Sequence, residues 1–229
     1  TNVNRFARLN SDGSFDATFN VGSGPDSIVF SALIQPDDKV LIGGSFSTVN
    51  GVVRNGVARL GTNGVVDPVF VTGTGANGSV FALALQRDGK VLIGGDFTTF
   101  NNNNRSGIAR LNADGSLDTS FNPGSGVNSA VRAVVLQSSG KIVIGGSFTT
   151  YNGTDRNFIA RLNLDGSLDT SFDTAGVNGG DASVLALAVE DDDDLVVVGN
   201  FSRFGNVTRN RITRLKPNGT TDPAINFGT

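Results

Sequence analysis

Apolar residues occur along this chain in short runs separated by turn-forming residues, and no stretch has the spacing of an amphipathic helix. The clearest runs are nearly continuous and rich in β-branched residues, which predicts strands covered on both faces. They are Val29–Ile34, Val80–Leu85, Val131–Leu136 and Val184–Val189. A short turn and a second run, such as Val91–Gly95, follow, so each pair of runs predicts a β-hairpin.

The apolar runs belong to an internal repeat. An Arg-Leu-x-x-(Asp/Asn)-Gly signature starts at Arg8, Arg59, Arg110, Arg161 and Arg214, at offsets of 51, 51, 51 and 53 residues. A Gly-Gly pair followed by Phe recurs from Gly43, Gly94 and Gly145 and, altered, from Gly199. Each period therefore predicts four short strands. The third ends at Arg59-Leu60 and the fourth at Phe70, or at the equivalents of these residues.

Each signature contains a tight turn with Asp or Asn before Gly, as in Asp12-Gly13. A hairpin loop built from a type I turn and a Gly at positive φ requires this order. Closing the hairpin there places each signature arginine opposite an aspartate, which predicts a cross-strand ion pair in every copy. The predicted pairs are Arg8–Asp16, Arg59–Asp67, Arg110–Asp118, Arg161–Asp169 and Arg214–Asp222.

Four-stranded units repeated about every 50 residues are typical of β-propellers. We therefore predict an all-β propeller of four-stranded antiparallel blades, with about four and a half repeats of ~51 residues. Small residues such as Ala82 and Ala133 suit strands that converge near an axis. The expected boundaries are a half-blade at 1–22 and full repeats at 23–73, 74–124, 125–176 and 177–229. A β-sandwich and a β-solenoid are the alternatives.

Two strings carry a family resemblance. Arg110–Phe121 and Arg161–Phe172 both read Arg-Leu-Asn-x-Asp-Gly-Ser-Leu-Asp-x-Ser-Phe, and Gln86–Phe97 is a second such string. These strings resemble the delta-60 repeat family, whose repeats are β-propeller units in large, mostly bacterial, secreted or surface proteins. The resemblance covers the whole chain. It implies a propeller and an extracellular or cell-surface location, and it brings no common enzymatic activity.

The two ends of the chain depart from the repeat. In the last copy the Gly pair becomes Gly199-Asn200, Asp191–Asp194 replace the turn that elsewhere ends in Lys, and Ile225 stands where Phe is usual. The third and fourth strands occur once more often than the first and second, so residues 1–22 predict half a blade. Because an unclosed ring leaves edge strands free to pair, we expect association through this edge, within a longer parent chain or with a neighbouring chain.

Loops between the second and third strands should share one face of a propeller. Polar side chains on loops of a rigid scaffold often bind partners, and this face collects Asn-rich turns and one arginine per repeat. The candidate ligand-binding residues are Arg54, Asn101, Asn102, Asn103, Arg105, Tyr151, Asn152, Arg156 and Arg209. The alternative is structural, because Asn and Gly form turns and each arginine can bond a carbonyl of its own blade.

The Asn-x-Asp-Gly-x-x-Asp spacing also resembles a set of alternating oxygen ligands for Ca²⁺. The candidate calcium ligands are Asn112, Asp114, Asp118, Asn163, Asp165 and Asp169. Gly61 and Lys216 stand where the first ligand should be in two other repeats. The pattern therefore fits a turn better than a metal site, and we predict no metal here. The acidic run Asp191–Asp194 is interpreted in the same way, as a solvated turn.

The composition excludes several kinds of chemistry. The sequence has no His and no Cys, which removes Ser-His-Asp and Cys-His catalysis, thiol chemistry and zinc-finger sites. We therefore predict a protein that is not an enzyme and has no cofactor. The formal net charge of −3 argues against nucleic-acid binding. No apolar run approaches the roughly 20 residues of a membrane-spanning helix, so no membrane insertion is expected.

Three functions remain open. The leading hypothesis is a non-catalytic scaffold or adhesive module of a secreted or cell-surface protein, with a protein or glycan at a cell surface as its partner. The second is a carbohydrate-binding or carbohydrate-active propeller, although the chain offers only Tyr151, and no Trp, for stacking on sugars. The third is a structural repeat that completes its half-blade with a neighbouring chain.

Overall fold

The computed structural model describes residues 5–172 and 179–224 of the chain. Every regular element in these ranges is a β-strand, and no helix within them is long and apolar enough to cross a membrane.

Five strands recur in four repeats. The first has β1 (Val29–Ile34), β2 (Val40–Gly44), β3 (Thr48–Val49), β4 (Val52–Val53) and β5 (Val57–Leu60). The second has β6 (Val80–Leu85), β7 (Val91–Gly95), β8 (Thr99–Phe100), β9 (Asn103–Asn104) and β10 (Ile108–Leu111). The third has β11 (Val131–Leu136), β12 (Ile142–Gly146), β13 (Thr150–Tyr151), β14 (Thr154–Asp155) and β15 (Ile159–Leu162). The fourth has β16 (Val184–Val189), β17 (Leu195–Gly199), β18 (Arg203–Phe204), β19 (Val207–Thr208) and β20 (Ile212–Leu215).

In each repeat, three strands form one antiparallel sheet and the two shortest strands form a separate hairpin. The sheets have the orders β1-β2-β5, β6-β7-β10, β11-β12-β15 and β16-β17-β20. The hairpins are β3–β4, β8–β9, β13–β14 and β18–β19, called here the outer hairpins. The predicted first strands coincide with β1, β6, β11 and β16.

The fourth strand of the predicted blade is not formed in the described residues. A single bridge, Leu60 to Val66 in the first repeat, replaces it, with equivalents at Leu9–Phe15, Leu111–Leu117, Leu162–Leu168 and Leu215–Thr221. The cause is a turn at Asp67, whose Oδ1 accepts the Val69 N–H at 3.0 Å and whose carbonyl accepts the Phe70 N–H at 3.4 Å. This turn curls the chain away from the sheet, so each blade has a three-stranded sheet and a detached hairpin.

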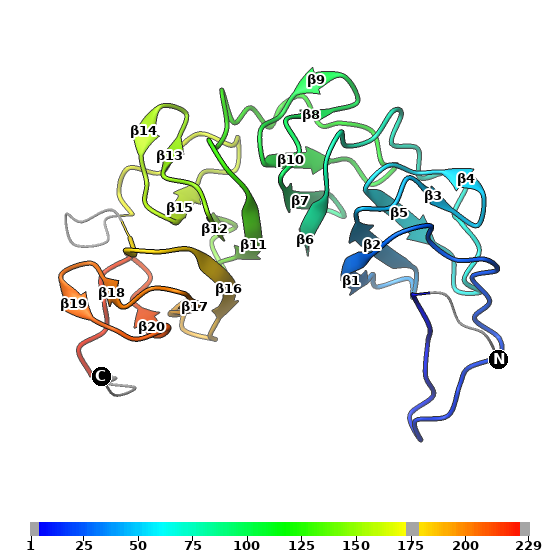
Figure 1. Cartoon of the computed structure of the whole chain (residues 1–229), viewed down its shortest axis with the longest axis horizontal. Helices are drawn as coiled ribbons and strands as arrows, with labels where there is room; N and C mark the ends of the chain where they lie inside the picture. The colour runs from blue at the N-terminus through cyan, green and yellow to red at the C-terminus, as the bar shows by residue number, and fades with distance from the viewer. Residues whose placement is uncertain (1–4, 173–178, 225–229) are drawn as a thin grey trace.

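The four repeats follow one another around an open arc (Figure 1). The strands β1, β6, β11 and β16 line the concave side of this arc, and each packs against the next. The outer hairpins lie along its convex side, one per repeat (Figure 1). The described N-terminal and C-terminal segments lie at opposite ends of the arc.

The hydrophobic core is built from layers between neighbouring repeats. The middle strands β2, β7 and β12 are buried along their whole length. At Gly94 of β7, a Cβ atom would lie 2.8 Å from a methyl group of both Val131 and Val134 in the next repeat. Such contacts are too short for a side chain, so glycine at this position lets adjacent sheets approach closely. Before the first repeat, Phe6 and Phe19 of the N-terminal segment pack on the same cluster as β2.

Apolar side chains of the first strand are exposed in the repeats at the two ends of the arc. Phe30 and Ile34 of β1 are 47% and 70% exposed, and Leu185 of β16 is 43% exposed. The prediction that all first strands are covered on both faces is therefore wrong for β1 and β16, each of which has a neighbouring first strand on one side only among the described residues. In the last repeat Val198 occupies the position of Gly94 and is exposed. The predicted departure at Ile225 lies outside the described residues.

Candidate functional site

The turns of the outer hairpins are braced by asparagine. Asn101 and Asn152 both have φ of 46°, a left-handed conformation that Asn tolerates better than most residues. The Oδ1 of Asn101 accepts the N–H of Thr74, and that of Asn152 accepts the N–H of Ser125, both at 3.1 Å. These donors lie in the loop that enters each repeat. Asn101 and Asn152 therefore hold two loops together, which supports the structural interpretation of both residues.

Asn102 and Asn103 lie exposed at the tip of the β8–β9 hairpin. Asn102 has φ of 60° where the other repeats have Gly51 and Gly153, and its side chain has no hydrogen-bond partner in the described part of the chain. The Nδ2 of Asn103 donates to the carbonyl of Asn101 at 2.7 Å. Of the predicted asparagines, Asn102 is thus the one whose amide is available to a ligand.

The four predicted arginines occupy equivalent positions and make equivalent bonds. Arg54, Arg105, Arg156 and Arg209 each donate from Nη1 to the carbonyl of the residue before them, at 2.7–3.0 Å. The alternative prediction for these arginines was a hydrogen bond to a carbonyl of their own blade, and the structure has this bond in all four repeats. Each arginine directly follows the second strand of an outer hairpin, β4, β9, β14 or β19. These hairpins lie one per repeat along the convex side (Figure 1), so the structure does not bring the arginines together around one ligand.

Tyr151 was predicted on a ligand-binding surface, but the structure places it in the core. Its side chain is fully buried, and its hydroxyl donates to the carbonyl of Gly166 at 2.5 Å. Burial raises the pKa of this hydroxyl. Val49, Phe100 and Phe204 fill the same position in the other repeats and are also buried, so the position belongs to the apolar core. Tyr151 therefore cannot stack on a sugar in the folded chain.

A second set of polar residues fastens the outer hairpins and was not singled out from the sequence. Asp26 accepts the backbone N–H groups of Ser47 and Thr48 at 2.8 and 3.1 Å, and hydrogen bonds from these two residues lower its pKa to about 2. The equivalent residues Asn77, Asn128 and Asp181 make the same bonds. Their spacing follows the repeat and could have revealed them.

All five predicted arginine–aspartate pairs are present. Each arginine donates from Nε to the Oδ2 of its aspartate at 2.8–2.9 Å, and the backbone pairing of the two residues fixes the hairpin register. Arg59, Arg110 and Arg161 are all less than a tenth exposed. These three pairs are thus buried.

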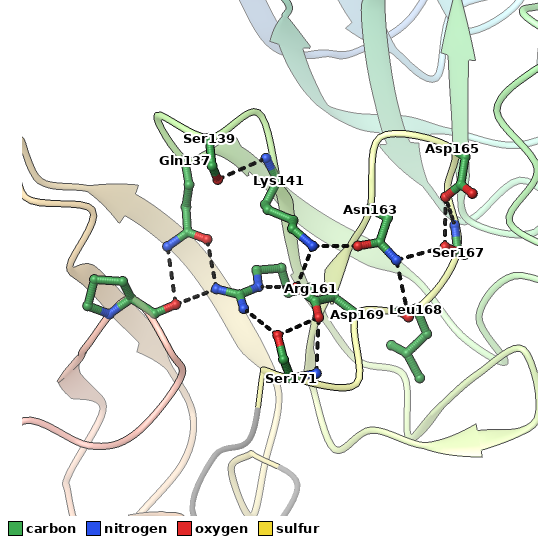
Figure 2. Close-up of polar contacts among 11 residues, drawn as sticks. Gln137, Ser139, Lys141, Arg161, Asn163, Asp165, Ser167, Leu168, Asp169 and Ser171 are labelled. Carbon is green, nitrogen blue, oxygen red and sulfur yellow. Dashed lines mark hydrogen bonds and ion pairs between the residues drawn. The ribbon is translucent and has the colours of Figure 1, made fainter.

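The buried arginines also tie neighbouring repeats together. Arg59 donates from Nη1 to the carbonyl of Ala113, and Arg110 to that of Leu164, both in the next repeat. Arg161 does the same to Pro217, and Figure 2 shows its further bonds to Gln137 and Ser171. Each arginine therefore joins a hairpin, its own sheet and the following repeat.

A lysine completes each of these networks. Lys39, Lys90 and Lys141 lie 2.9–3.2 Å from the aspartate of their own repeat. Burial raises the pKa of Asp118, but hydrogen bonds from Lys90, Ser120 and Arg110 outweigh burial and hold the pKa well below its usual range. The network therefore keeps its carboxylates charged at neutral pH and stabilises the fold.

The candidate calcium residues are used in turns and ion pairs. Asn112 donates to Ser116, the Oδ1 of Asp114 accepts from Ser116, and Asp118 is paired with two cations. Asn163, Asp165 and Asp169 repeat this arrangement (Figure 2). Among the described residues, the acidic groups whose oxygens approach within 4.8 Å of one another are Glu190, Asp192 and Asp194. The candidate calcium residues are thus occupied by turn hydrogen bonds and ion pairs.

In the acidic turn of the last repeat, a negative side chain replaces the positive one of the other repeats, and a lysine nearby compensates for it. Asp194 stands where other repeats have lysine, and Lys216 stands where they have Asn112 or Asn163. Lys216 donates to Asp194 at 2.9 Å and lies 3.0 Å from Asp222. The interpretation of Asp191–Asp194 as a wholly solvated turn is therefore wrong for Asp194, which is 1% exposed and paired.

A sequence profile for a β-propeller domain of unknown function, DUF5122, matches five segments of this chain. They are residues 1–19, 35–70, 86–121, 137–172 and 191–224. Four of the five run from the turn before the second strand to the end of the signature hairpin, and the first covers that hairpin at the start of the chain. Together they include well over half of the sequence. No match was found among curated proteins.

Solved β-propellers share the fold at low sequence identity. The WD40 propeller domain of Doa1 is 18% identical, with a TM-score of 0.55 over 81% of this chain and 51% of that one. Streptogramin B lyase is 17% identical, with a TM-score of 0.54 over 93% and 59%. An inactive histidine-to-alanine variant of virginiamycin B lyase from Staphylococcus aureus is 19% identical, with a TM-score of 0.50 over 86% and 58%. This chain thus spans roughly half to three fifths of these proteins, and the likeness shows the propeller fold alone.

Proposed function

Because the chain belongs to the DUF5122 β-propeller family, we propose that it is a non-catalytic interaction module of a secreted or cell-surface protein. Its outer hairpins bind a protein partner. The observation that carries this proposal is the contrast between the braced frame of these hairpins and the variety of their exposed tips. The strands that follow these tips carry different exposed pairs, which are Val52-Val53, Asn103-Asn104, Thr154-Asp155 and Val207-Thr208. A rigid frame that presents different side chains at one position is suited to recognition.

A polar hollow beside the first two repeats supports the same surface. It has a volume of about 240 Å³ and lies between the loop that leaves β2 and the loop that enters β6. Ser47 and Asn55 line it from one repeat, and Asn77 and Ser79 line it from the next. The hydroxyl groups of Ser47 and Ser79 in this hollow can hydrogen-bond to a partner, whereas the Asn77 amide is occupied by Thr98 and Thr99. The exposed Val53 nearby, 62% exposed, adds an apolar contact.

The chemistry of the chain supports a non-catalytic role. The similar virginiamycin B lyase is described as catalytically inactive when one histidine is replaced by alanine, and this chain contains no histidine. The buried aspartates are held in ion pairs that serve the fold. A protein without histidine, and with its buried carboxylates paired, is better suited to binding than to acid–base catalysis.

The test is binding to an array of extracellular proteins and glycans. A loop variant, Val53→Asp with Asn103→Ala, should lose saturable binding to a protein probe, and Asn102→Ala should weaken it. Asp37→Ala, in the β1–β2 turn at the other end of the sheets, is the matched control and should bind normally. Binding that survives the loop variant would contradict the proposal. Saturable binding to glycans alone would replace it with the carbohydrate-binding alternative.

Self-association is a second candidate, because both ends of the arc expose apolar strand residues. Phe30 and Ile34 lie at one end, and Leu185 and Val198 at the other. Exposed edge strands with apolar side chains favour pairing with another chain. Light scattering should then show a mass that rises with concentration in the native chain and stays constant in Phe30→Asp. A single mass of 23.6 kDa at all concentrations would contradict this second role.

A further inference from the structure

A hollow of about 310 Å³ lies between the second and third repeats, at the end of the sheets away from the outer hairpins. The β6–β7 turn contributes Arg87 on one side, and Gly140 of the β11–β12 turn lies on the other. Leu136 and Leu164 provide an apolar wall, and Leu164 is 55% exposed. The hollow thus combines a cation with apolar surface.

The next junction along the arc shows what such a space can hold. Between the third and fourth repeats, Asp193 reaches across to the turn that contains Ser138. Its Oδ1 accepts the Ser138 backbone N–H at 2.7 Å, and its Oδ2 accepts the Ser138 hydroxyl at 2.5 Å. Asp193 and Gly140 occupy the same turn position, as do Ser138 and Arg87. An aspartyl carboxylate therefore fills the last junction, and at the second-to-third junction the equivalent residue has no side chain.

The donors of the second-to-third junction are left free. In the part of the chain that the structure describes, neither the backbone N–H nor the guanidinium of Arg87 has a hydrogen-bond partner. The Oε1 of the adjacent Gln86, a hydrogen-bond acceptor, is buried and unpartnered. The facing acidic group is Asp88, which accepts the Lys90 N–H at 3.1 Å. A negatively charged group with two oxygens would satisfy the Arg87 donors.

The first-to-second junction cannot act in this way. The residue equivalent to Arg87 there is Pro36, which has no backbone N–H to donate. Of the three described junctions, one is blocked by proline and one is filled by Asp193. The remaining one has a free donor pair, a vacant glycine position and an apolar wall.

We propose that this hollow is a binding site for a carboxylate, supplied by an acidic side chain in a turn of a partner polypeptide. The carboxylate takes the place that Asp193 has in the next junction, accepting from the Arg87 N–H and guanidinium. Leu136 and Leu164 pack against the carbons that carry it. An aspartate in a turn is the favoured source because the chain itself uses that arrangement at the equivalent position.

The test uses N-acetylaspartate amide as the probe and follows the Arg87 amide resonance by heteronuclear NMR. A saturable shift is expected with this probe and none with N-acetylasparagine amide, which has the same shape without the charge. Arg87→Ala should weaken binding about tenfold, because a hydrogen bond to a charged group is lost. Gly140→Asp should abolish binding, because it supplies an internal carboxylate.

The Gly140→Asp variant is expected to fold. Asp38 and Asp193 occupy the same turn position with φ of 61° and 66°, and a Cβ at Gly140 would meet only the end of the Leu164 side chain, at 3.0 Å. Gly89→Asp is the control, because its carboxylate would face Pro36 and leave Arg87 free. Unchanged affinity in Gly140→Asp, or no saturable shift with the aspartyl probe, would overturn the site. Tighter binding of glucuronate than of the aspartyl probe would overturn the polypeptide source.

Discussion

Replacement of Arg110 by alanine should destabilise the chain more than any other single charge removal in the second repeat. Arg110 is 7% exposed, and its guanidinium donates to Asp118 at 2.8 Å and to the carbonyl of Leu164 in the next repeat at 2.5 Å. It also lies 5.0 Å from the centre of the Phe121 ring. The substitution therefore removes an ion pair, a bond between repeats and a cation–π contact together.

The size of the loss in the free energy of unfolding depends on the interactions that Asp118 keeps in the variant. Removing one partner of a buried ion pair costs about 3–5 kcal/mol, and a cation–π contact adds about 0.5–1 kcal/mol. Asp118 keeps hydrogen bonds from Lys90 and Ser120, so its charge is not left alone. The loss in the free energy of unfolding should therefore lie near the lower end of that range, at about 3 kcal/mol.

Urea unfolding followed by far-ultraviolet circular dichroism measures this loss. Arg8→Ala is the matched control, because Arg8 makes the same pair with Asp16 but its side chain is 34% exposed, and in the described residues it bonds no carbonyl of another repeat. Arg8→Ala should cost clearly less than Arg110→Ala. Equal losses, or a loss below about 1 kcal/mol for Arg110→Ala, would refute the argument that burial and the bond between repeats give this arginine its effect.

Four further outcomes are expected. The pKa of Asp118 is lower in the folded chain than in the unfolded one, so the charged Asp118 stabilises the fold above about pH 4, and this stabilisation is lost as the pH falls further. In an acid titration, the free energy of unfolding of Asp118→Asn should therefore fall less steeply than that of the native chain. Gly94→Val should lower the free energy of unfolding by about 1–3 kcal/mol in urea unfolding, because its Cβ alone would clash with Val131, and no loss would contradict close packing between repeats. Asn102→Gly should be neutral or raise the melting temperature, since φ is 60° there, and a clear drop would show that its amide stabilises the fold. Tyr151→Phe should cost about 1 kcal/mol through the lost bond to Gly166 and leave partner binding intact; altered binding would return Tyr151 to the ligand surface.

Local patterns in the sequence predicted the strands and the signature hairpin well. β1, β6, β11 and β16 have the predicted bounds, because each apolar run lies between turn residues. The Arg110–Asp118 pair followed from the Asp-Gly turn, which fixes the register of two residues eight positions apart. Both features depend on contacts between residues close together in the chain, and local residue patterns determine such contacts.

Features that depend on contacts between repeats were harder to predict. The burial of Tyr151 depends on a hydrophobic cluster that joins the second and third repeats. The burial of Asp194 depends on a charge exchange with Lys216 of the same repeat, which shows only when that repeat is compared with the others. The fourth strand failed for a different reason, because the side chain of Asp67 bonds the backbone two residues on and replaces sheet pairing by a turn. The free donors of Arg87 became visible only by comparing the junctions with one another.

Hydrogen exchange of the chain with and without its protein partner tests the central claim most directly. If the outer hairpins bind the partner, amide protection should increase at β3–β4, β8–β9, β13–β14 and β18–β19 and in the loops between them, with no change along β1 or β16. Protection confined to the exposed edges of β1 and β16, with the outer hairpins exchanging as in the free chain, would contradict the proposed function.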